Sequence, residues 1–168
     1  KQKKNIAVRD LQSGEMKNYS YDKLIIATGS SSIILPEFDP SLENVFYIKT
    51  ITDLIKLSSY KENKSVKSAA VIGAGYLGLE MTDALSTAGI EVTLFERESK
   101  PFPSAEKEIQ LLIEELLKRK QVGFYPNSES VKPCIAGNKL KSINLDGRIL
   151  EYDVYIITAG VKPVTDLF

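Results

Sequence analysis

The stretch AVIGAGYLGLE, residues 70–80, is the most informative part of this sequence. Its apolar start belongs to a segment over 67–73 that is typical of a buried strand, and apolar side chains recur at helical spacing over 76–88. Between the two lies a Gly-x-Gly-x-x-Gly pattern. A glycine turn that connects a strand to a helix in this way predicts a nucleotide-binding βαβ unit.

Each glycine of the turn has a separate physical task. Gly73 permits a tight turn, Gly75 lets the backbone approach a pyrophosphate, and Gly78 lets the helix pack closely against the strand. The start of the helix presents free N–H groups and positive partial charge to the phosphates. A glycine-rich connection without a ligand is the alternative interpretation. The predicted cofactor-binding loop consists of six consecutive residues: Gly73, Ala74, Gly75, Tyr76, Leu77 and Gly78.

Two charged residues at the end of the next expected strand, over 91–96, bear on the type of dinucleotide. Glu96 can accept hydrogen bonds from the adenosine ribose hydroxyls, which favours NADH. Arg97 comes directly after it, and its planar guanidinium could instead bind the 2′-phosphate of NADPH. The pair could also be merely exposed charges at a strand end. The pattern therefore favours NADH and leaves NADPH open.

Two further helices are expected on either side of this unit. One spans 52–62, with Thr52 as its N-cap, and the other spans 104–120, with Ser104 as its N-cap. The second helix carries an apolar stripe that we expect to pack in the core. Five residues form the stripe: Ile109, Leu112, Ile113, Leu116 and Leu117.

The remaining segments have the patterns of strands. Residues 21–30 contain a continuous apolar run, which predicts a strand buried on both faces. Pro36 and Pro40 indicate a linker. Gly137-Asn138 and Asp146-Gly147 are hairpin turn signals, so a β-meander is expected after residue 122. The other expected strands cover 5–10, 16–19, 122–125, 129–136, 139–145, 148–152 and 153–158.

The composition excludes several classes of function. Basic and acidic residues both number 22, so the formal net charge is zero, which argues against a nucleic-acid binder. The chain has no histidine and only Cys134, which rules out an internal disulfide and argues against a Cys/His zinc site. We expect Cys134 to be a packing thiol, no metal, a cytoplasmic location and chemistry carried by a cofactor. No apolar run approaches the length of a membrane span.

Four stretches together resemble the FAD-dependent pyridine nucleotide-disulfide oxidoreductases, and most closely their coenzyme A-disulfide reductase, NADH oxidase and NADH peroxidase branch. They are YDKLIIATGS (21–30), AVIGAGYLGLE (70–80), EVTLFE (91–96) and YDVYIITAGVKP (152–163). The resemblance implies an α/β fold. It consists of a Rossmann-like NAD(P)-binding domain with a parallel sheet, flanking helices and a β-meander, plus partial strands of an FAD-binding domain.

The resemblance also implies roles for individual residues. Tyr76 matches a tyrosine that lies over the flavin where nicotinamide docks, and Glu80 matches a glutamate near the flavin and nicotinamide, so both are candidate catalytic residues. Thr28 and Gly29 match a turn that touches FAD. Gly160 matches a second turn, which approaches the nicotinamide dinucleotide. An ordinary helix start at Tyr76, an exposed Glu80 and plain tight connections at the two turns are the alternatives.

The chain also departs from the family pattern. No FAD-binding glycine motif precedes residue 21, and the redox-active cysteine expected there is missing. We therefore expect an internal fragment, inactive alone, of a parent that is homodimeric and whose remaining FAD and interface domains are its partners. The expected division is a partial FAD-binding domain over 1–40, an NAD(P)-binding domain over 41–160, and a return to the FAD-binding domain over 161–168.

The function expected from these observations is hydride transfer in the parent from NADH or NADPH to FAD. The electrons would pass on to a disulfide, peroxide, oxygen or protein acceptor, and the flavin would carry the chemistry. A non-catalytic dinucleotide-binding module, acting as a redox sensor or interaction domain, is the alternative.

Overall fold

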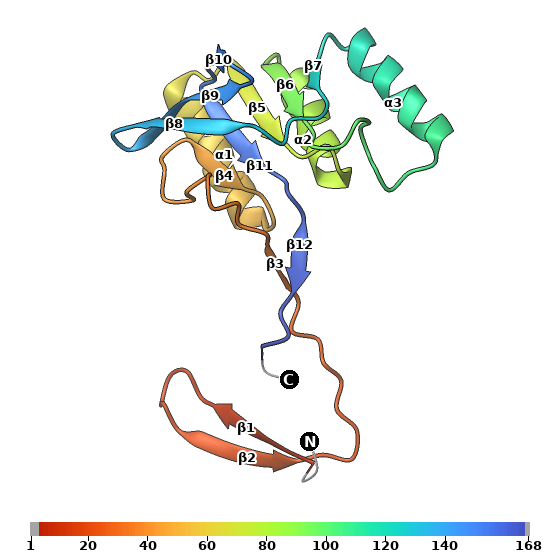
Figure 1. The fold of residues 1–168 in the computed structure, drawn as a ribbon. Helices are drawn as coiled ribbons and strands as arrows, with labels where there is room; N and C mark the ends of the chain where they lie inside the picture. The colour runs from red at the N-terminus through yellow and green to blue at the C-terminus, as the bar shows by residue number, and fades with distance from the viewer. Residues whose placement is uncertain (1–3, 167–168) are drawn as a thin grey trace. The chain divides into compact units, whose positions relative to one another are not determined.

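The computed structural model describes residues 4–166, which divide into two compact units (Figure 1). The smaller unit contains residues up to Gly29 and those from Val164 onward, and the larger unit is Ser30–Pro163. The expected domain limits at 40/41 and 160/161 both lie inside the larger unit, the first about ten residues from its start and the second three residues from its end.

A parallel sheet of five strands forms the centre of the larger unit. The strand order is β4-β11-β5-β6-β7, and all neighbouring pairs are parallel. This confirms the predicted α/β fold with a parallel sheet. The strands are β4 (Val45–Tyr47), β5 (Ser68–Ile72), β6 (Glu91–Phe95), β7 (Gly123–Tyr125) and β11 (Val154–Ile157).

Different layers cover the two faces of this sheet, as Figure 1 shows. Ala69 and Val71 of β5 face the helices, whereas Ala70 and Ile72 face the β-meander, because successive side chains of a strand point to opposite sides. The helices are α1 (Ile51–Lys64), α2 (Tyr76–Thr87) and α3 (Lys107–Arg119). The antiparallel meander consists of β8 (Lys132–Ala136), β9 (Lys139–Leu145) and β10 (Arg148–Leu150). The expected hairpin turns connect its strands.

The N-cap predicted for α1 is wrong. Thr50, not Thr52, caps the helix, and it forms a capping box with Asp53. The Asp53 carboxylate accepts the backbone N–H of Thr50 at 2.8 Å, and the Thr50 hydroxyl accepts the N–H of Asp53 at 3.3 Å. Thr52 lies inside the first turn, so its side chain is not at the N-cap position from which the free backbone N–H groups of that turn are accepted.

The burial predicted for α3 is also wrong in part. Of the five stripe residues Leu117 is buried and Ile113 half-buried, whereas Ile109, Leu112 and Leu116 are exposed. The helix packs beside β7, a strand of three residues at the edge of the sheet, which offers little apolar surface. Its N-cap is Glu106 rather than Ser104, and Glu106 forms no side-chain cap hydrogen bond.

The smaller unit contains an antiparallel hairpin of β1 (Asn5–Arg9) and β2 (Met16–Ser20), as expected. The buried strand expected over 21–30 is not formed: residues 21–29 have no strand, and Ile25 is 89% exposed. No strand among residues 4–166 lies beside this segment, so its backbone lacks the partners that a buried strand requires. Ser30 instead begins β3 (Ser30–Ser32) of the larger unit, which pairs with β12 (Val161–Pro163).

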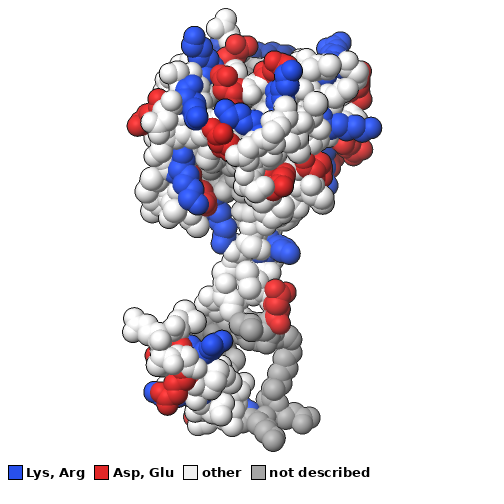
Figure 2. All heavy atoms as spheres, turned by 90° about the vertical axis from the view of Figure 1, so that its left-hand side faces the viewer, with Lys and Arg blue, Asp and Glu red and all other residues white. Residues whose placement is uncertain are grey.

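Cys134 is exposed on β8, which corrects its prediction as a packing thiol, because its side chain points away from the sheet that the meander covers. Figure 2 shows lysine and arginine interspersed with aspartate and glutamate over the visible face of the larger unit. No helix within residues 4–166 is both long and apolar enough to cross a membrane.

Candidate functional site

The glycine turn connects the carboxyl end of β5 to the amino end of α2, as its sequence predicts. Gly73 has a φ of +107°, which glycine tolerates and L-residues rarely adopt. A Cβ atom on Gly78 would lie 1.9 Å from the carbonyl oxygen of Gly73, so only glycine fits there. A Cβ atom on Gly75, in contrast, would meet no atom within 4 Å. The open side of the turn is therefore at Gly75, the N-cap of α2.

A second segment clamps the turn from the neighbouring strand. The hydroxyl of Thr158, just after β11, donates to the carbonyl oxygens of Gly73 at 2.8 Å and of Ile72 at 3.0 Å. The backbone N–H of Thr158 also donates to Ile72. No local pattern predicts a role for this threonine, although it lies in the YDVYIITAG stretch. Thr158 therefore fixes the conformation of the turn on the side away from Gly75.

Glu96 holds the turn from the other side. It is buried, with 7% of its surface exposed, at the end of β6. Its Oε2 accepts the N–H of Ala74 at 2.7 Å, and its Oε1 accepts the N–H of Glu98 at 3.0 Å. Arg97 points outward and forms an ion pair with Glu98, with an Nε–Oε1 distance of 3.3 Å. The two residues expected to select the dinucleotide thus lie in different environments, one buried and one exposed.

A cavity of about 690 Å³ opens in front of the turn. It lies at the carboxyl ends of β5, β6 and β11, which is where ligands bind in open parallel sheets. Its volume lies within the range of sites for small molecules and cofactors. Residues from these strand ends and from loops over 33–38, 97–103 and 128–131 line it: Ile33, Leu35, Glu37, Phe38, Ile72, Gly73, Gly75, Phe95, Glu96, Arg97, Glu98, Pro103, Ser128, Glu129, Val131, Thr158, Ala159 and Gly160.

The segment 33–38 forms one wall of this cavity, although its prolines indicated only a linker. The hydroxyl of Tyr47 holds it by donating to the carbonyl oxygen of Phe38 at 2.8 Å and accepting the N–H of Leu35 at 3.2 Å. Burial raises the pKa of Tyr47, which keeps this hydroxyl protonated. Nothing in the local pattern of 33–38 indicates a binding wall, because the contact depends on a strand later in the chain.

The structure separates the predicted site residues into three groups. Members of the glycine turn, Glu96, Arg97 and Gly160 gather at the cavity. Tyr76 and Glu80 lie on the exposed surface of α2, one helical turn apart, and Tyr76 is 70% exposed. Thr28 and Gly29 belong to the smaller unit. There the Thr28 hydroxyl donates to the carbonyl oxygen of Val164, and the Val164 N–H donates to Gly29 at 3.0 Å.

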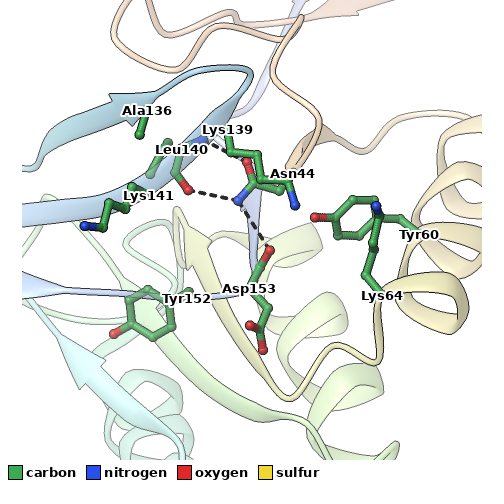
Figure 3. A pocket seen from close by; sticks show the side chains of 9 residues that line it. All are labelled: Asn44, Tyr60, Lys64, Ala136, Lys139, Leu140, Lys141, Tyr152 and Asp153. Atoms are coloured by element: carbon green, nitrogen blue, oxygen red, sulfur yellow. Dashed lines mark hydrogen bonds between the residues drawn. The ribbon is translucent and has the colours of Figure 1, made fainter.

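A second cavity, of about 370 Å³, lies at the opposite ends of the sheet strands, near the amino end of β11 (Figure 3). Asn44 forms its floor. Its side chain bonds to both backbone groups of Leu140 at 2.9 Å and to the carbonyl oxygen of Asp153 at 3.3 Å. Lys64 and Lys139 at the rim both pair with Glu43. The hydrogen bonds of Asn44 therefore join the meander to the sheet, and Lys64 and Lys139 share the single carboxylate of Glu43.

Comparison with known proteins identifies the family of the chain. The family model described as pyridine nucleotide-disulphide oxidoreductase matches residues 1–168. The chain belongs to the pyridine nucleotide-disulphide oxidoreductase family. This confirms the predicted family membership.

Individual members of the pyridine nucleotide-disulphide oxidoreductase family are similar over nearly the whole chain. An NADH oxidase of Methanocaldococcus jannaschii is 27% identical over 157 residues, which cover 93% of this chain and 35% of that protein. A monodehydroascorbate reductase of Cucumis sativus is 32% identical, with 98% and 39% covered. The structure of a water-forming NADH oxidase from Lactobacillus brevis bound to NADH has a TM-score of 0.80, 28% identity and coverage of 99% and 36%.

The chain spans between 35% and 40% of the length of the first curated relatives that it matches. These relatives differ in the acceptors that their names give. Family membership therefore supports nicotinamide dinucleotide and flavin cofactors and leaves the acceptor open.

Proposed function

We propose that the larger unit binds NADH or NADPH and supplies the electron-donor site of a flavoprotein oxidoreductase. The observation that carries this proposal is the open Gly75, where a pyrophosphate can approach the backbone beside the 690 Å³ cavity. Gly75 also begins α2, whose first N–H groups and positive partial charge favour an anion. Glu96 and Arg97 lie at the cavity where the adenosine ribose would bind, and they keep NADH and NADPH both as candidate ligands.

The flavin belongs to this proposal only at the level of the whole protein. FAD in the whole protein would supply the redox chemistry, with the nicotinamide as hydride donor and a disulfide, peroxide, oxygen or protein as final acceptor. The residues that match its turn, Thr28 and Gly29, bond to Val164 and line neither of the two cavities described above. We therefore assign to this chain the binding and orientation of the dinucleotide, in a cytoplasmic parent protein.

Calorimetric titration tests this binding. NADH and NADPH are titrated separately into the chain and into a Gly75→Val variant, whose side chain would occupy the place of the pyrophosphate. We expect saturable heat with at least one dinucleotide, and a loss of affinity of tenfold or more in the variant. Ala84→Val is the matched control, because Ala84 is exposed on the same helix away from the turn. Absence of heat with both dinucleotides, or equal affinity in Gly75→Val, would contradict the proposal.

A non-catalytic dinucleotide-binding module is the second candidate. One observation favours it: Tyr76 and Glu80, the candidate catalytic residues, are exposed and do not line the cavity. The two functions are distinguished by the rate at which the full-length parent, supplied with FAD, oxidises NADH. NADH oxidation with an artificial electron acceptor that falls in a Glu80→Gln variant supports catalysis. Dinucleotide binding without any turnover supports the module.

A further inference from the structure

The connection between β6 and α3 returns to the glycine turn before α3 begins. The backbone N–H of Phe102 donates to the carbonyl oxygen of Ala74 at 2.8 Å. Pro103, the next residue, lines the 690 Å³ cavity. We name residues 101–105 the proline loop. The proline loop therefore contacts the glycine turn directly and contributes to the wall of the cavity.

The backbone of the proline loop is held in a conformation that its sequence does not favour. Phe102 has a φ of +51°, in the left-handed region that L-residues other than asparagine and aspartate rarely adopt. The N–H of Ala105 donates to the carbonyl oxygen of Phe102 at 2.9 Å and closes the loop on itself. A backbone in such a region persists only where surrounding contacts hold it. The proline loop therefore depends on contacts from outside its own residues.

One side chain of α3 gathers the carbonyl groups of the proline loop. The Nε2 atom of Gln110 donates to the carbonyl oxygen of Ala105 at 2.9 Å. The same atom lies 3.4 Å from the carbonyl oxygens of Phe102 and of Pro103. Gln110 is half-buried between the loop and the helix. Its two amide hydrogens therefore face three acceptors, all of them in the proline loop.

A second contact from α3 is weaker. Glu114 follows Gln110 by one helical turn, and both of its carboxylate oxygens lie 3.0 Å from the Nζ atom of Lys100, just before the loop. The Lys100 side chain is 43% exposed, so solvent screens this ion pair. The amide of Gln110 is therefore the main polar contact by which α3 holds the proline loop.

We propose that Gln110 is a positioning residue for the dinucleotide site. It holds the proline loop against the glycine turn, so that the wall of the cavity is formed before a ligand arrives. Gln110 is not among the residues that line the cavity, so it acts through the loop. Once this contact is lost, the loop adopts other conformations, and the apparent dissociation constant rises as the fraction of ordered loop falls. The proposal rests on the proposed dinucleotide binding.

The position of the proline loop indicates which part of the ligand it affects. Pro103 lines the cavity together with Glu96 and Arg97, at the end where the adenosine ribose is proposed to bind. ADP-ribose contains this ribose and the pyrophosphate but lacks the nicotinamide. The loss of Gln110 should therefore weaken the binding of ADP-ribose by the same factor as that of NADH.

Calorimetric titration of a Gln110→Leu variant tests the proposal, because leucine fills the same space and cannot donate. We expect the dissociation constants of NADH and ADP-ribose both to rise about fivefold, as for the loss of one hydrogen bond. The melting temperature should fall by only about 2–4 °C, since the contact lies at the surface. Leu111→Gln is the matched control: it makes the reverse exchange at the next residue, which is exposed, and should leave both affinities unchanged.

The possible failures of this titration are distinct. Affinities that are equal in the unchanged chain and in Gln110→Leu would overturn the positioning role alone. Absence of binding by the unchanged chain would overturn the proposed function, and this proposal with it.

A pH series with Gln110→Glu separates donation from mere space filling. At pH 8 the carboxylate faces the loop carbonyls without a hydrogen to donate, and Glu106 and Glu114 lie one helical turn away on either side. Lys107 and the Lys100 that pairs with Glu114 are the nearby cations. Protonation restores a donor, and these acceptors raise the pKa of the new carboxyl above its ordinary value of about 4.3.

The dissociation constant of ADP-ribose for Gln110→Glu, divided by that for the unchanged chain, should therefore fall as the pH is lowered from 8 to 5. A Leu111→Glu variant adds the same charge to the neighbouring exposed position, and its ratio should stay near one throughout. A ratio for Gln110→Glu that is constant over this range would overturn the role of the donated hydrogen bond.

Discussion

The Oε2 atom of Glu96 lies 2.7 Å from the backbone nitrogen of Ala74, so the end of β6 holds the glycine turn that follows β5. A residue expected to contact the ribose is therefore also part of the structure of the loop that would receive the pyrophosphate. Because the carboxylate is buried and accepts two backbone N–H groups, its removal would leave both donors without a partner.

Replacing Glu96 by alanine should therefore lower the free energy of unfolding by about 2 kcal/mol, since an unsatisfied buried donor costs about 1–3 kcal/mol. Urea denaturation measures this change. Glu98→Ala is the control, because the Glu98 side chain is exposed and its ion pair with Arg97 is a surface pair of little energy. Equal losses in the two variants would show that the hydrogen bonds of Glu96 do not stabilise the turn.

Two alanine substitutions in the same glycine turn should have opposite effects on folding. Gly78→Ala places a Cβ atom 1.9 Å from the Gly73 carbonyl oxygen and should cost about 1–3 kcal/mol, because helix α2 must shift. Gly75→Ala meets no atom within 4 Å and has a φ of −75°, so its stability should stay equal or rise slightly. Thermal unfolding of both variants measures these two changes in stability. A Gly75→Ala variant as unstable as Gly78→Ala would contradict the open geometry at Gly75.

Replacing Thr82 by valine should not destabilise the fold, although Thr82 is 2% exposed. Its hydroxyl is buried without a hydrogen-bond partner among the described residues, so an apolar group of the same shape removes a desolvation cost. We expect a free energy of unfolding that is unchanged or up to about 1 kcal/mol higher. Thr158→Val makes the same change where the hydroxyl donates to Gly73, and it should be destabilising. A loss in Thr82→Val as large as that in Thr158→Val would refute this assignment.

The carboxylate of Asp153 should make the free energy of unfolding depend on pH. Burial raises its pKa, but hydrogen bonds from Lys67 and Ser68 outweigh burial, so the pKa lies below its ordinary value. A depressed pKa in the folded state stabilises the fold above the unfolded pKa of about 3.9, and this contribution is lost as the pH falls through the folded pKa.

Asp153→Asn should consequently be less stable than the unchanged chain at pH 7, by about 1 kcal/mol because the group is mostly exposed to screening by solvent. The difference between the two proteins should shrink below about pH 4. Urea denaturation at a series of pH values measures this difference. A gap that stays constant from pH 7 to pH 3 would exclude the carboxylate as its cause.

The parts of the fold that depend on near neighbours could be predicted from the sequence. The turn at Gly73, the helix after it and the hairpin turns of the meander each follow from a few consecutive residues. The cap of α1 was missed by two positions because Thr50 and Thr52 are both chemically suitable, and only the pairing of Thr50 with Asp53 decides between them.

The features that depend on distant segments could not be predicted in this way. Thr158 and Gly73 are 85 positions apart, so the hydrogen bond by which Thr158 fixes the turn cannot be predicted from neighbouring residues. The stripe of α3 has the periodicity of a core helix, yet how much of it is buried depends on the short edge strand β7. The segment 21–29 likewise has the composition of a buried strand, but its conformation depends on whether neighbouring strands are available.

The place of β11 in the sheet has a consequence for the order of folding during synthesis. Although β11 is the last strand of the sheet to leave the ribosome, it lies between β4 and β5. Until residue 157 has emerged, β4 and β5 each present an open edge toward the gap, and open edges can pair with other chains. Before β11 is in place, the single strand β4 and the group β5-β6-β7 are therefore separate, and their unpaired edges expose the nascent chain to aggregation.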